Sequence, residues 1–223
     1  MKTGIIVAMD KELALLLPLI KDCSEITVND ITFRQGHIDG RAVVVAKSGI
    51  GKVNAAMTTL TMIENFHVAL IINTGVAGGT GLGANILDVV IADRVAYHDV
   101  WCGPDTIPGQ ASGCPLFFVN PLLRNILEKI PGVKVGLIAT GDTFISTPDE
   151  IERIRGLYPD VMAVDMESAA IAQVCHIKNV PFMSIRVVSD TPGQDDNIAQ
   201  YENFWSDAPK SSFATLLNIL ALL

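Results

Sequence analysis

The sequence has no run of basic residues and no long apolar segment. It carries 16 Lys and Arg residues against 24 Asp and Glu residues, which gives a formal net charge of −8. Binding to a nucleic-acid backbone needs a clustered basic surface, so we expect no nucleic acid as a partner. The apolar run at residues 4–9 ends at Asp10 and Lys11 and is too short for a signal peptide or a membrane span. We therefore expect a soluble, cytoplasmic protein without a membrane partner.

Cysteine is also scarce and scattered. Cys23, Cys102, Cys114 and Cys175 form no C-x-x-C pair, and the four histidines make no ligand-spaced cluster with them. This pattern predicts neither a disulfide framework nor a structural zinc site. We expect no metal and no cofactor.

The hydrophobic patterns that are present predict one α/β domain. Apolar runs at residues 4–9 and 69–73 are typical of strands buried on both faces, and strands are also predicted at 86–92, 133–140 and 181–188. Helical patterns occur at 13–20, 53–66, 121–129 and 201–223. Two further helices are predicted, one that begins at Thr147-Pro148 and another that ends at His176. Short extended segments at 25–28, 31–37 and 42–47 predict an antiparallel meander. We expect a single domain over residues 1–223, with a central mixed, mainly parallel twisted sheet flanked by helices.

Two glycine-rich segments invite a nucleotide-binding interpretation, and neither supports it well. Residues 48–52 read Ser-Gly-Ile-Gly-Lys, but no glycine stands at position 46 and Val53 replaces the Ser or Thr of a P-loop. In the second segment, which begins at Thr74, Gly79, Gly81 and Ala84 satisfy a G-x-G-x-x-A spacing. A strand-like run at 86–92 follows where a dinucleotide site needs a helix. A glycine-eased helix entry and a close approach of main chain to ligand remain as interpretations.

Three acidic residues follow predicted strands. Glu12, Glu167 and Asp190 all fall at strand-to-helix or strand-end positions, which a parallel sheet would bring to the same edge. One carboxylic acid, one carboxylate that activates water and a third that binds sugar hydroxyls suit cleavage of a glycosidic bond. The alternative is structural: Glu167 as a first-turn carboxylate and Asp190 as a turn residue. Residues 99–113, rich in Pro and Gly, are predicted to form a flap beside a pocket.

The chain resembles a known family along nearly its whole length. The resemblance is carried by Gly4-Ile5-Ile6 with Ala8-Met9 and Glu12, residues 48–53, Ile71-Ile72-Asn73-Thr74-Gly75, Ala77-Gly78-Gly79, Tyr97-His98-Asp99, Gly141-Asp142, Phe144-Ile145, Met166-Glu167, Ala172, Val174-Cys175-His176, residues 179–182 and Ser189-Asp190. Together these motifs are similar to those of the 5′-methylthioadenosine/S-adenosylhomocysteine nucleosidases of the purine nucleoside phosphorylase superfamily.

The resemblance implies hydrolysis of an N-glycosidic bond and a role for each matching residue. Asp190 is implied as the general acid at adenine N7, and Glu12 as the residue that activates water with Arg186 nearby. Glu167 would bind the ribose hydroxyls, Met166 would pack under the sugar, and Phe144 with the backbone of Ile145 would hold adenine. Further substrate-binding positions implied by the match are Met9, Ile50, Val76, Ala77, Gly78, Ser189, Tyr201 and Phe204.

The resemblance also implies a homodimer in which residues 99–113 lie near the partner's pocket. The sequence departs from the family at Val76, where Ser is common, at Asp165, where Glu is common, and most of all at residues 100–111. Two alternatives stay open. One is a related hydrolase of futalosine-type nucleosides, and the other is a non-catalytic nucleoside-binding protein. A phosphorylase would need a cationic phosphate site, whereas Glu12 stands after the first strand and no Arg precedes Arg34.

Overall fold

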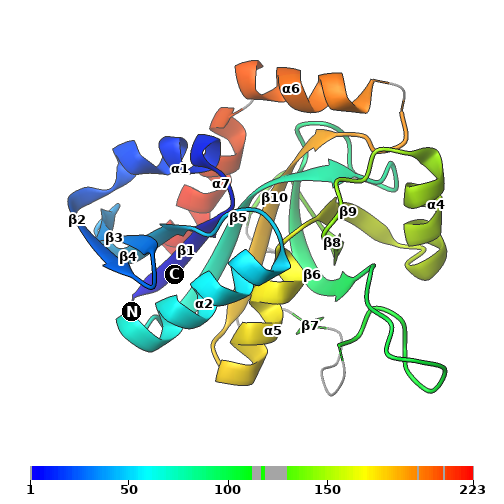
Figure 1. Cartoon of the computed structure of the whole chain (residues 1–223). Helices are drawn as coiled ribbons and strands as arrows, with labels where there is room; N and C mark the ends of the chain where they lie inside the picture. Colours follow the sequence, from blue (N-terminus) through cyan, green and yellow to red (C-terminus); the bar gives the residue numbers. More distant parts are fainter. Residues whose placement is uncertain (1, 112–116, 119–129, 195, 208, 223) are drawn as a thin grey trace.

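A computed structural model describes residues 2–111, 117–118, 130–194, 196–207 and 209–222 (Figure 1). Its first strand shows how the sequence builds the core. Strand β1 (Thr3–Val7) is buried along its whole length. Ile6 packs into one apolar cluster, while Ile5 and Val7 pack into another on the opposite face. A strand with apolar partners on both faces needs no alternation of polar residues, which explains the unbroken run in the sequence.

The strands join into one sheet that closes on itself. Its order is β10-β6-β8-β9-β5-β1-β4-β3-β2, with β7 paired to β6 and a further pairing of β10 with β5. That last pairing closes β5, β9, β8, β6 and β10 into a small barrel. The other strands are β2 (Lys21–Val28), β3 (Ile31–Ile38), β4 (Arg41–Lys47), β5 (Leu70–Gly79), β6 (Val89–Tyr97), β7 (Phe117–Phe118), β8 (Val133–Thr140), β9 (Val161–Asp165) and β10 (Phe182–Asp190).

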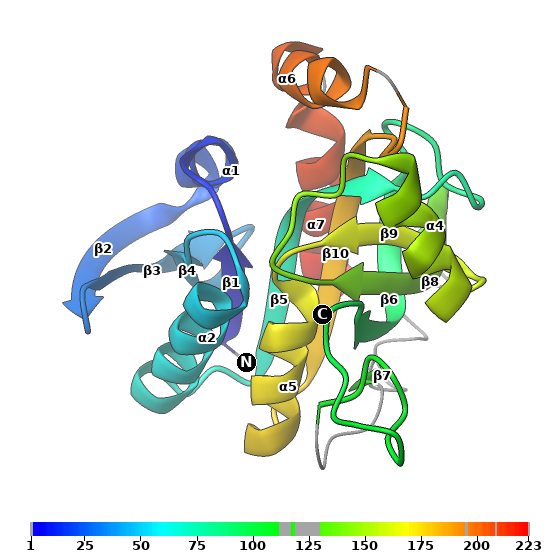
Figure 2. The same ribbon diagram turned by 45° about the vertical axis from the view of Figure 1, so that its right-hand side comes forward.

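Helices cover both faces of the sheet (Figures 1 and 2). Helices α2 (Lys52–Phe66) and α5 (Ser168–Lys178) lie side by side and contribute to one apolar cluster. Helices α1 (Asp10–Leu16) and α7 (Pro209–Leu222) contribute Leu13, Leu16 and Leu216 to the cluster on the opposite face. The remaining elements are the 3₁₀ turn η1 (Leu17–Leu19), α4 (Pro148–Leu157) and α6 (Asn197–Asp207).

The predicted single-domain α/β class, with a mixed sheet flanked by helices, is confirmed. The meander is confirmed as β2, β3 and β4, which pair antiparallel in sequence order. Strand β8 covers the predicted residues 133–140. Helix α4 begins as predicted, since Thr147 caps it by accepting a hydrogen bond from the Glu150 amide, and Pro148 occupies its first turn.

Some predicted element boundaries were wrong. The strand predicted at 69–73 is longer, because β5 continues to Gly79 and pairs with β10 and β9 through its glycines. The strand predicted at 86–92 is displaced, since β6 spans Val89–Tyr97. The C-terminal helix is two helices, α6 and α7, and the second begins at Pro209, a residue type that is common at the first position of a helix. The predicted helix at 121–129 lies outside the described residues.

Of the flap predicted at 99–113, the structure describes residues 99–111. They form neither helix nor strand and project as the green loop in Figure 1. Within the described chain, none of the helices combines the length and the apolar character needed to cross a bilayer.

Candidate active site

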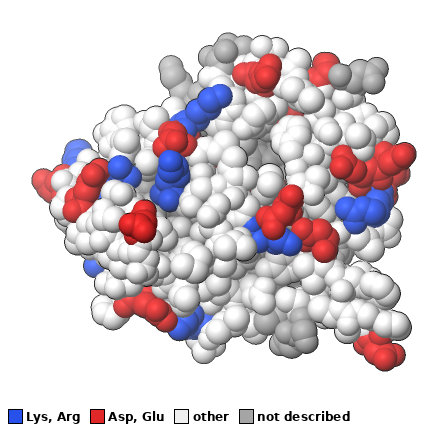
Figure 3. Space-filling model, in the orientation of Figure 1, with Lys and Arg blue, Asp and Glu red and all other residues white. Residues whose placement is uncertain are grey.

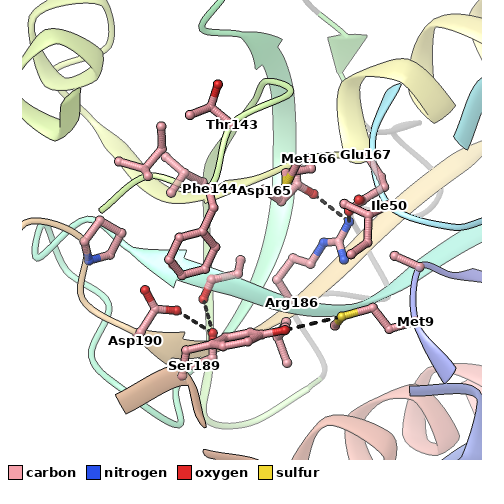
Figure 4. Close-up of a pocket in the computed structure, with 18 of the residues that line it drawn as sticks. Met9, Ile50, Thr143, Phe144, Asp165, Met166, Glu167, Arg186, Ser189 and Asp190 are labelled. Atoms are coloured by element: carbon pink, nitrogen blue, oxygen red, sulfur yellow. Dashed lines mark hydrogen bonds and ion pairs between the residues drawn. The ribbon is translucent and has the colours of Figure 1, made fainter. Parts of the chain in front are cut away.

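A cavity opens where β1, β5 and β10 end. The space between its walls, including the part open to solvent, is about 630 Å³. Figure 4 shows Asp190 and Phe144 on one side and Glu167, Ile50 and Met9 on the other. The residues that line it are Ala8, Met9, Glu12, Ile50, Val76, Ala77, Gly78, Thr143, Phe144, Ile145, Val164, Asp165, Met166, Glu167, Arg186, Ser189, Asp190, Pro192 and Tyr201.

Glu12, in the first turn of α1, is buried against the end of β5. Its Oε2 accepts hydrogen bonds from the amides of Ala8 and Met9 at 2.8 and 3.0 Å, and its Oε1 accepts one from the amide of Val76 at 3.1 Å. Burial raises the pKa of Glu12, while Arg186 and these three amides act in the opposite direction. The carboxylate is thus held rigidly by main-chain donors.

Gly75 makes room for this carboxylate. A Cβ at Gly75 would lie 2.3 Å from Oε1 of Glu12 and 2.7 Å from Nη1 of Arg186. Because glycine has no side chain, the carboxylate of Glu12 and the guanidinium of Arg186 can both approach β5 at this residue.

Arg186, on β10, is fully buried among acidic and polar groups. Its Nη2 lies 2.6 Å from Oδ2 of Asp165 and 3.3 Å from Oε2 of Glu167, and it donates to Oδ1 of Asn73 at 2.5 Å. A buried guanidinium needs compensating charge and acceptors, which these three side chains supply. Asp165 in turn accepts a hydrogen bond from Oγ1 of Thr140 at 2.5 Å and one from Ser168.

Glu167 directly precedes α5 and is buried. Its Oε1 accepts a hydrogen bond from the amide of Gly51, 116 positions away, at 3.0 Å. Burial raises the pKa of Glu167 to about 7, although Arg186 acts in the opposite direction. The carboxyl group therefore changes its charge near neutral pH.

Asp190 ends β10 beside Phe144 (Figure 4). Its Oδ1 accepts a hydrogen bond from Ser189 at 2.6 Å, and its Oδ2 accepts one from Nδ2 of Asn197 at 3.2 Å. Burial raises its pKa against the effect of these two hydrogen bonds. A carboxyl with a raised pKa keeps a proton available for transfer.

Aromatic and apolar side chains complete the cavity. The rings of Phe144 and Tyr201 meet edge to face with centroids 5.5 Å apart, and the Tyr201 hydroxyl lies 3.3 Å from Sδ of Met9. Phe144 keeps 44% of its surface exposed although its neighbour Ile145 is buried. An exposed ring at a cavity wall is available for stacking on a planar ligand.

The structure brings fourteen of the fifteen predicted site residues to this cavity. The exception is Phe204, which is buried in the apolar core and packs against Trp205. It lies about 4.5 Å further along α6 than Tyr201, since a helix rises ~1.5 Å per residue, and that turn covers the core. The lining also includes Ala8, Thr143, Val164, Asp165 and Pro192.

The predicted convergence on one sheet edge needs a correction for Glu167. β1 and β10 each run parallel to β5, which explains the placement of Glu12 and Asp190. β9, which precedes Glu167, pairs antiparallel to β5 at Gly78 and Gly79. Because the barrel is closed, β9 lies beside the end of β5. Glu167 therefore reaches the cavity from a strand that runs antiparallel to β5.

Asn197 is a site residue that the sequence prediction missed. Its Nδ2 contacts Oδ2 of Asp190 and the carbonyl oxygen of Ile145, at 3.2 and 3.4 Å. Within the described residues, no group of three His, Cys, Asp or Glu side chains has the arrangement of a metal site.

Comparison with known proteins agrees with this geometry. The family model of the phosphorylase superfamily matches residues 2–221. The chain is 43% identical over 216 residues to the 5′-methylthioadenosine/S-adenosylhomocysteine nucleosidase of Anoxybacillus flavithermus, covering 93% of each chain, and 38% identical over 227 residues to that of Oceanobacillus iheyensis, covering 99% of each. The solved Streptococcus pneumoniae MTA/SAH nucleosidase in complex with 8-aminoadenine superimposes with a TM-score of 0.94 at 39% identity, with all of both chains covered. The chain therefore belongs to the 5′-methylthioadenosine/S-adenosylhomocysteine nucleosidases of the phosphorylase superfamily.

Proposed function

We propose that the protein hydrolyses the N-glycosidic bond of 5′-methylthioadenosine and S-adenosylhomocysteine, releasing adenine and the 5-thio-substituted ribose. The observation that carries the proposal is the presence of Glu12, Glu167 and Asp190 in one cavity whose wall also carries the exposed ring of Phe144. Two carboxyl groups with separate roles are the standard requirement for glycosidic cleavage. The names of the relatives support the same substrates.

Asp190 acts as the general acid in this proposal. Its proton passes to N7 of adenine while the bond between N9 and C1′ breaks, so the base leaves as a neutral molecule. The raised pKa of Asp190 and its position beside Phe144 support this role. Ser189 and Asn197 fix one carboxyl oxygen each.

Glu12 acts as the base that orients water and removes its proton as the oxygen bonds to C1′. Both of its oxygens are fixed by amides, and Gly75 leaves space in which Oε1 and Nη1 of Arg186 approach one point. A water within reach of both atoms would be held by an acceptor and a cationic donor. Val76 has no hydroxyl to offer to the water or the sugar, so only its main-chain amide can donate at this position, and that amide contacts Glu12.

The remaining groups bind substrate. Glu167 accepts hydrogen bonds from the ribose 2′- and 3′-hydroxyls, and Met166 packs under the sugar. Phe144 stacks on adenine, while the main chain of Ile145 bonds the edge of the base. Met9, Ile50 and Tyr201 provide apolar surface for the 5′-thioalkyl group, which their place in the lining supports.

Water is favoured over phosphate as the nucleophile. Among the lining residues, Arg186 is the sole Lys or Arg. Its Nη2 is already engaged by Asp165, Glu167 and Asn73. A phosphate dianion beside Glu12 would meet a carboxylate, and the single positive charge of Arg186 is already offset by Asp165 and Glu167.

A homodimer is part of the proposal. Helix α2 exposes Val53 and Met57 next to the exposed Ile50 of the cavity wall, and the flap exposes Trp101 and Ile107. Exposed apolar side chains at the rim of a site are typical of surfaces that a second chain covers. Residues 99–113 would then lie near the partner's cavity.

The experiment is a parallel assay of base release with and without phosphate. It follows adenine from methylthioadenosine and S-adenosylhomocysteine, hypoxanthine from inosine, and the base from futalosine. We expect release from the two thio-nucleosides, independent of phosphate. Release from futalosine alone would favour the related hydrolase. Binding of methylthioadenosine without cleavage would favour the non-catalytic protein.

A further inference from the structure

A cluster of three charged residues lies beside the cavity without lining it. Lys52 begins α2, Asp99 follows β6, and Asp142 follows β8. Nζ of Lys52 lies 2.7 Å from Oδ2 of Asp99 and 3.7 Å from Oδ2 of Asp142. The cluster therefore joins three segments that are distant in the sequence.

Main-chain amides close the cluster into a ring. The amide of Asp142 donates to Oδ2 of Asp99 at 2.9 Å, and the amide of Lys52 donates to Oδ1 of Asp142 at 2.8 Å. Partial burial acts to raise the pKa of Asp99, but the hydrogen bonds from Lys52 and Asp142 hold that pKa below its ordinary value. Asp99 is thus ionised at neutral pH, and its bonds are charge-assisted.

Each end of the ring is attached to a substrate-binding group. Gly51, directly before Lys52, donates its amide to Oε1 of Glu167. Gly51 has a φ of +96°, and a Cβ there would lie 3.0 Å from Oδ1 of Asp142, so the turn packs closely on the ring. Thr143, Phe144 and Ile145 follow Asp142 and line the cavity.

The charged pair of Lys178 and Glu64 lacks this connection. These residues are also 2.7 Å apart, but they join the helices α5 and α2 at positions that do not adjoin a cavity-lining residue. On the face shown in Figure 3, basic and acidic side chains are scattered singly or in small groups. Lys52 differs in that it joins the turn at Gly51, which holds Glu167, to the loop after Asp142, which carries Phe144.

We infer that Lys52 is a positioning residue, which through Asp99 and Asp142 sets the turn that holds Glu167 and the loop that carries Phe144. The inference rests on the proposed function, because it assigns Glu167 to ribose and Phe144 to adenine. Both are binding groups, and a displacement of about 1 Å in such groups is costly to an enzyme. Loss of the Lys52 charge should therefore weaken substrate binding more than it slows the chemical step.

The test compares Lys52→Met, Lys52→Arg and Asp99→Asn with the control Lys178→Met. For methylthioadenosine we expect Lys52→Met to raise KM on the order of tenfold with a smaller change in kcat, and Lys52→Arg to restore much of the loss. The double variant Lys52→Met/Asp99→Asn should be no worse than the more severe single variant, because both remove the same ion pair. Free adenine has no ribose, so its Kd by calorimetry reports on the Phe144 loop alone and should also rise in Lys52→Met.

Stability separates positioning from general damage. Ion pairs that keep contact with solvent contribute little to stability, and both pairs are at least partly exposed. Lys52→Met and Lys178→Met should therefore each lower Tm by no more than about 4 °C. A wild-type KM and adenine Kd in Lys52→Met, with an active wild-type enzyme, would overturn the inference and leave the proposed function standing. An equal rise of KM in Lys178→Met would also overturn it. A wild-type protein that binds thio-nucleosides without releasing adenine would overturn the proposed function instead, while the two binding constants would still test Lys52.

Discussion

Nδ2 of Asn197 donates to Oδ2 of Asp190 at 3.2 Å and also reaches the carbonyl oxygen of Ile145 at 3.4 Å. One side chain from the start of α6 thus ties the proposed general acid to the loop proposed to hold adenine. Because the amide donates to the carboxylate, it stabilises the charged form of Asp190 against the effect of burial.

Asn197→Ala should shift the alkaline limit of activity. Removing the donor raises the pKa of Asp190 further, so the general acid stays protonated to higher pH and the alkaline limb of kcat/KM moves upward. We also expect kcat to fall several-fold, since the carboxyl loses one fixed contact. The measurement is the pH profile of kcat/KM. Asn65→Ala, which removes a hydrogen bond within α2, is the control, and identical profiles for both variants would contradict the assignment.

Gly75→Ala should disable the site. The added methyl would lie within 3 Å of both Glu12 and Arg186, and overpacking of this kind costs about 1–3 kcal/mol. We expect lower thermal stability and a large loss of activity. Gly156→Ala in α4 is the matched control, because its Cβ would meet nothing within 4 Å. The prediction fails if Gly75→Ala has wild-type activity.

Substrate binding should depend on pH through Glu167. Burial raises the pKa of Glu167 to about 7, so the group loses its charge as pH falls below that value. The ionised carboxylate is the better acceptor for two ribose hydroxyls, and KM for methylthioadenosine should therefore rise as pH falls through about 7. Glu167→Gln should show a raised KM without this titration. A KM of the wild type that is constant between pH 6 and 8 would contradict the role given to Glu167.

Glu12→Gln should bind substrate and fail to cleave it. The amide oxygen can still accept hydrogen bonds from main-chain amides, but the group cannot remove a proton from water. Loss of a general base typically costs about 10²–10⁴ in rate. Single-turnover assays with saturating methylthioadenosine measure this loss directly. Normal turnover would mean that another group activates the water.

Much of the site was predictable because strand ends are visible in the sequence. The apolar run at residues 4–9 predicts that Glu12 follows a strand, and the strand predicted at 181–188 does the same for Asp190. Parallel pairing of β1 and β10 with β5 then brings both to one edge. The start of α4 was also predictable, because Thr147 caps the helix and Pro148 occupies its first turn.

The rest depends on contacts between distant segments. The extension of β5 through Gly75, Gly78 and Gly79 is stabilised by pairing with β10 and β9, which outweighs the weak strand preference of glycine. Closure of the barrel, which carries Glu167 to the cavity on an antiparallel strand, has no sequence signal either. Asn197 stands seven positions from Asp190, and only the path of the intervening loop makes them partners.

Asp190→Asn tests the central claim most directly, through adenine release and methylthioadenosine affinity measured on the same protein. The shape of the side chain is nearly kept, but no proton can be delivered to the departing base. We predict that the wild-type protein releases adenine without phosphate, and that Asp190→Asn loses about 10²–10⁴ in kcat while its Kd for methylthioadenosine stays within a few-fold of wild type. Release of adenine by Asp190→Asn at a near wild-type rate would contradict the account.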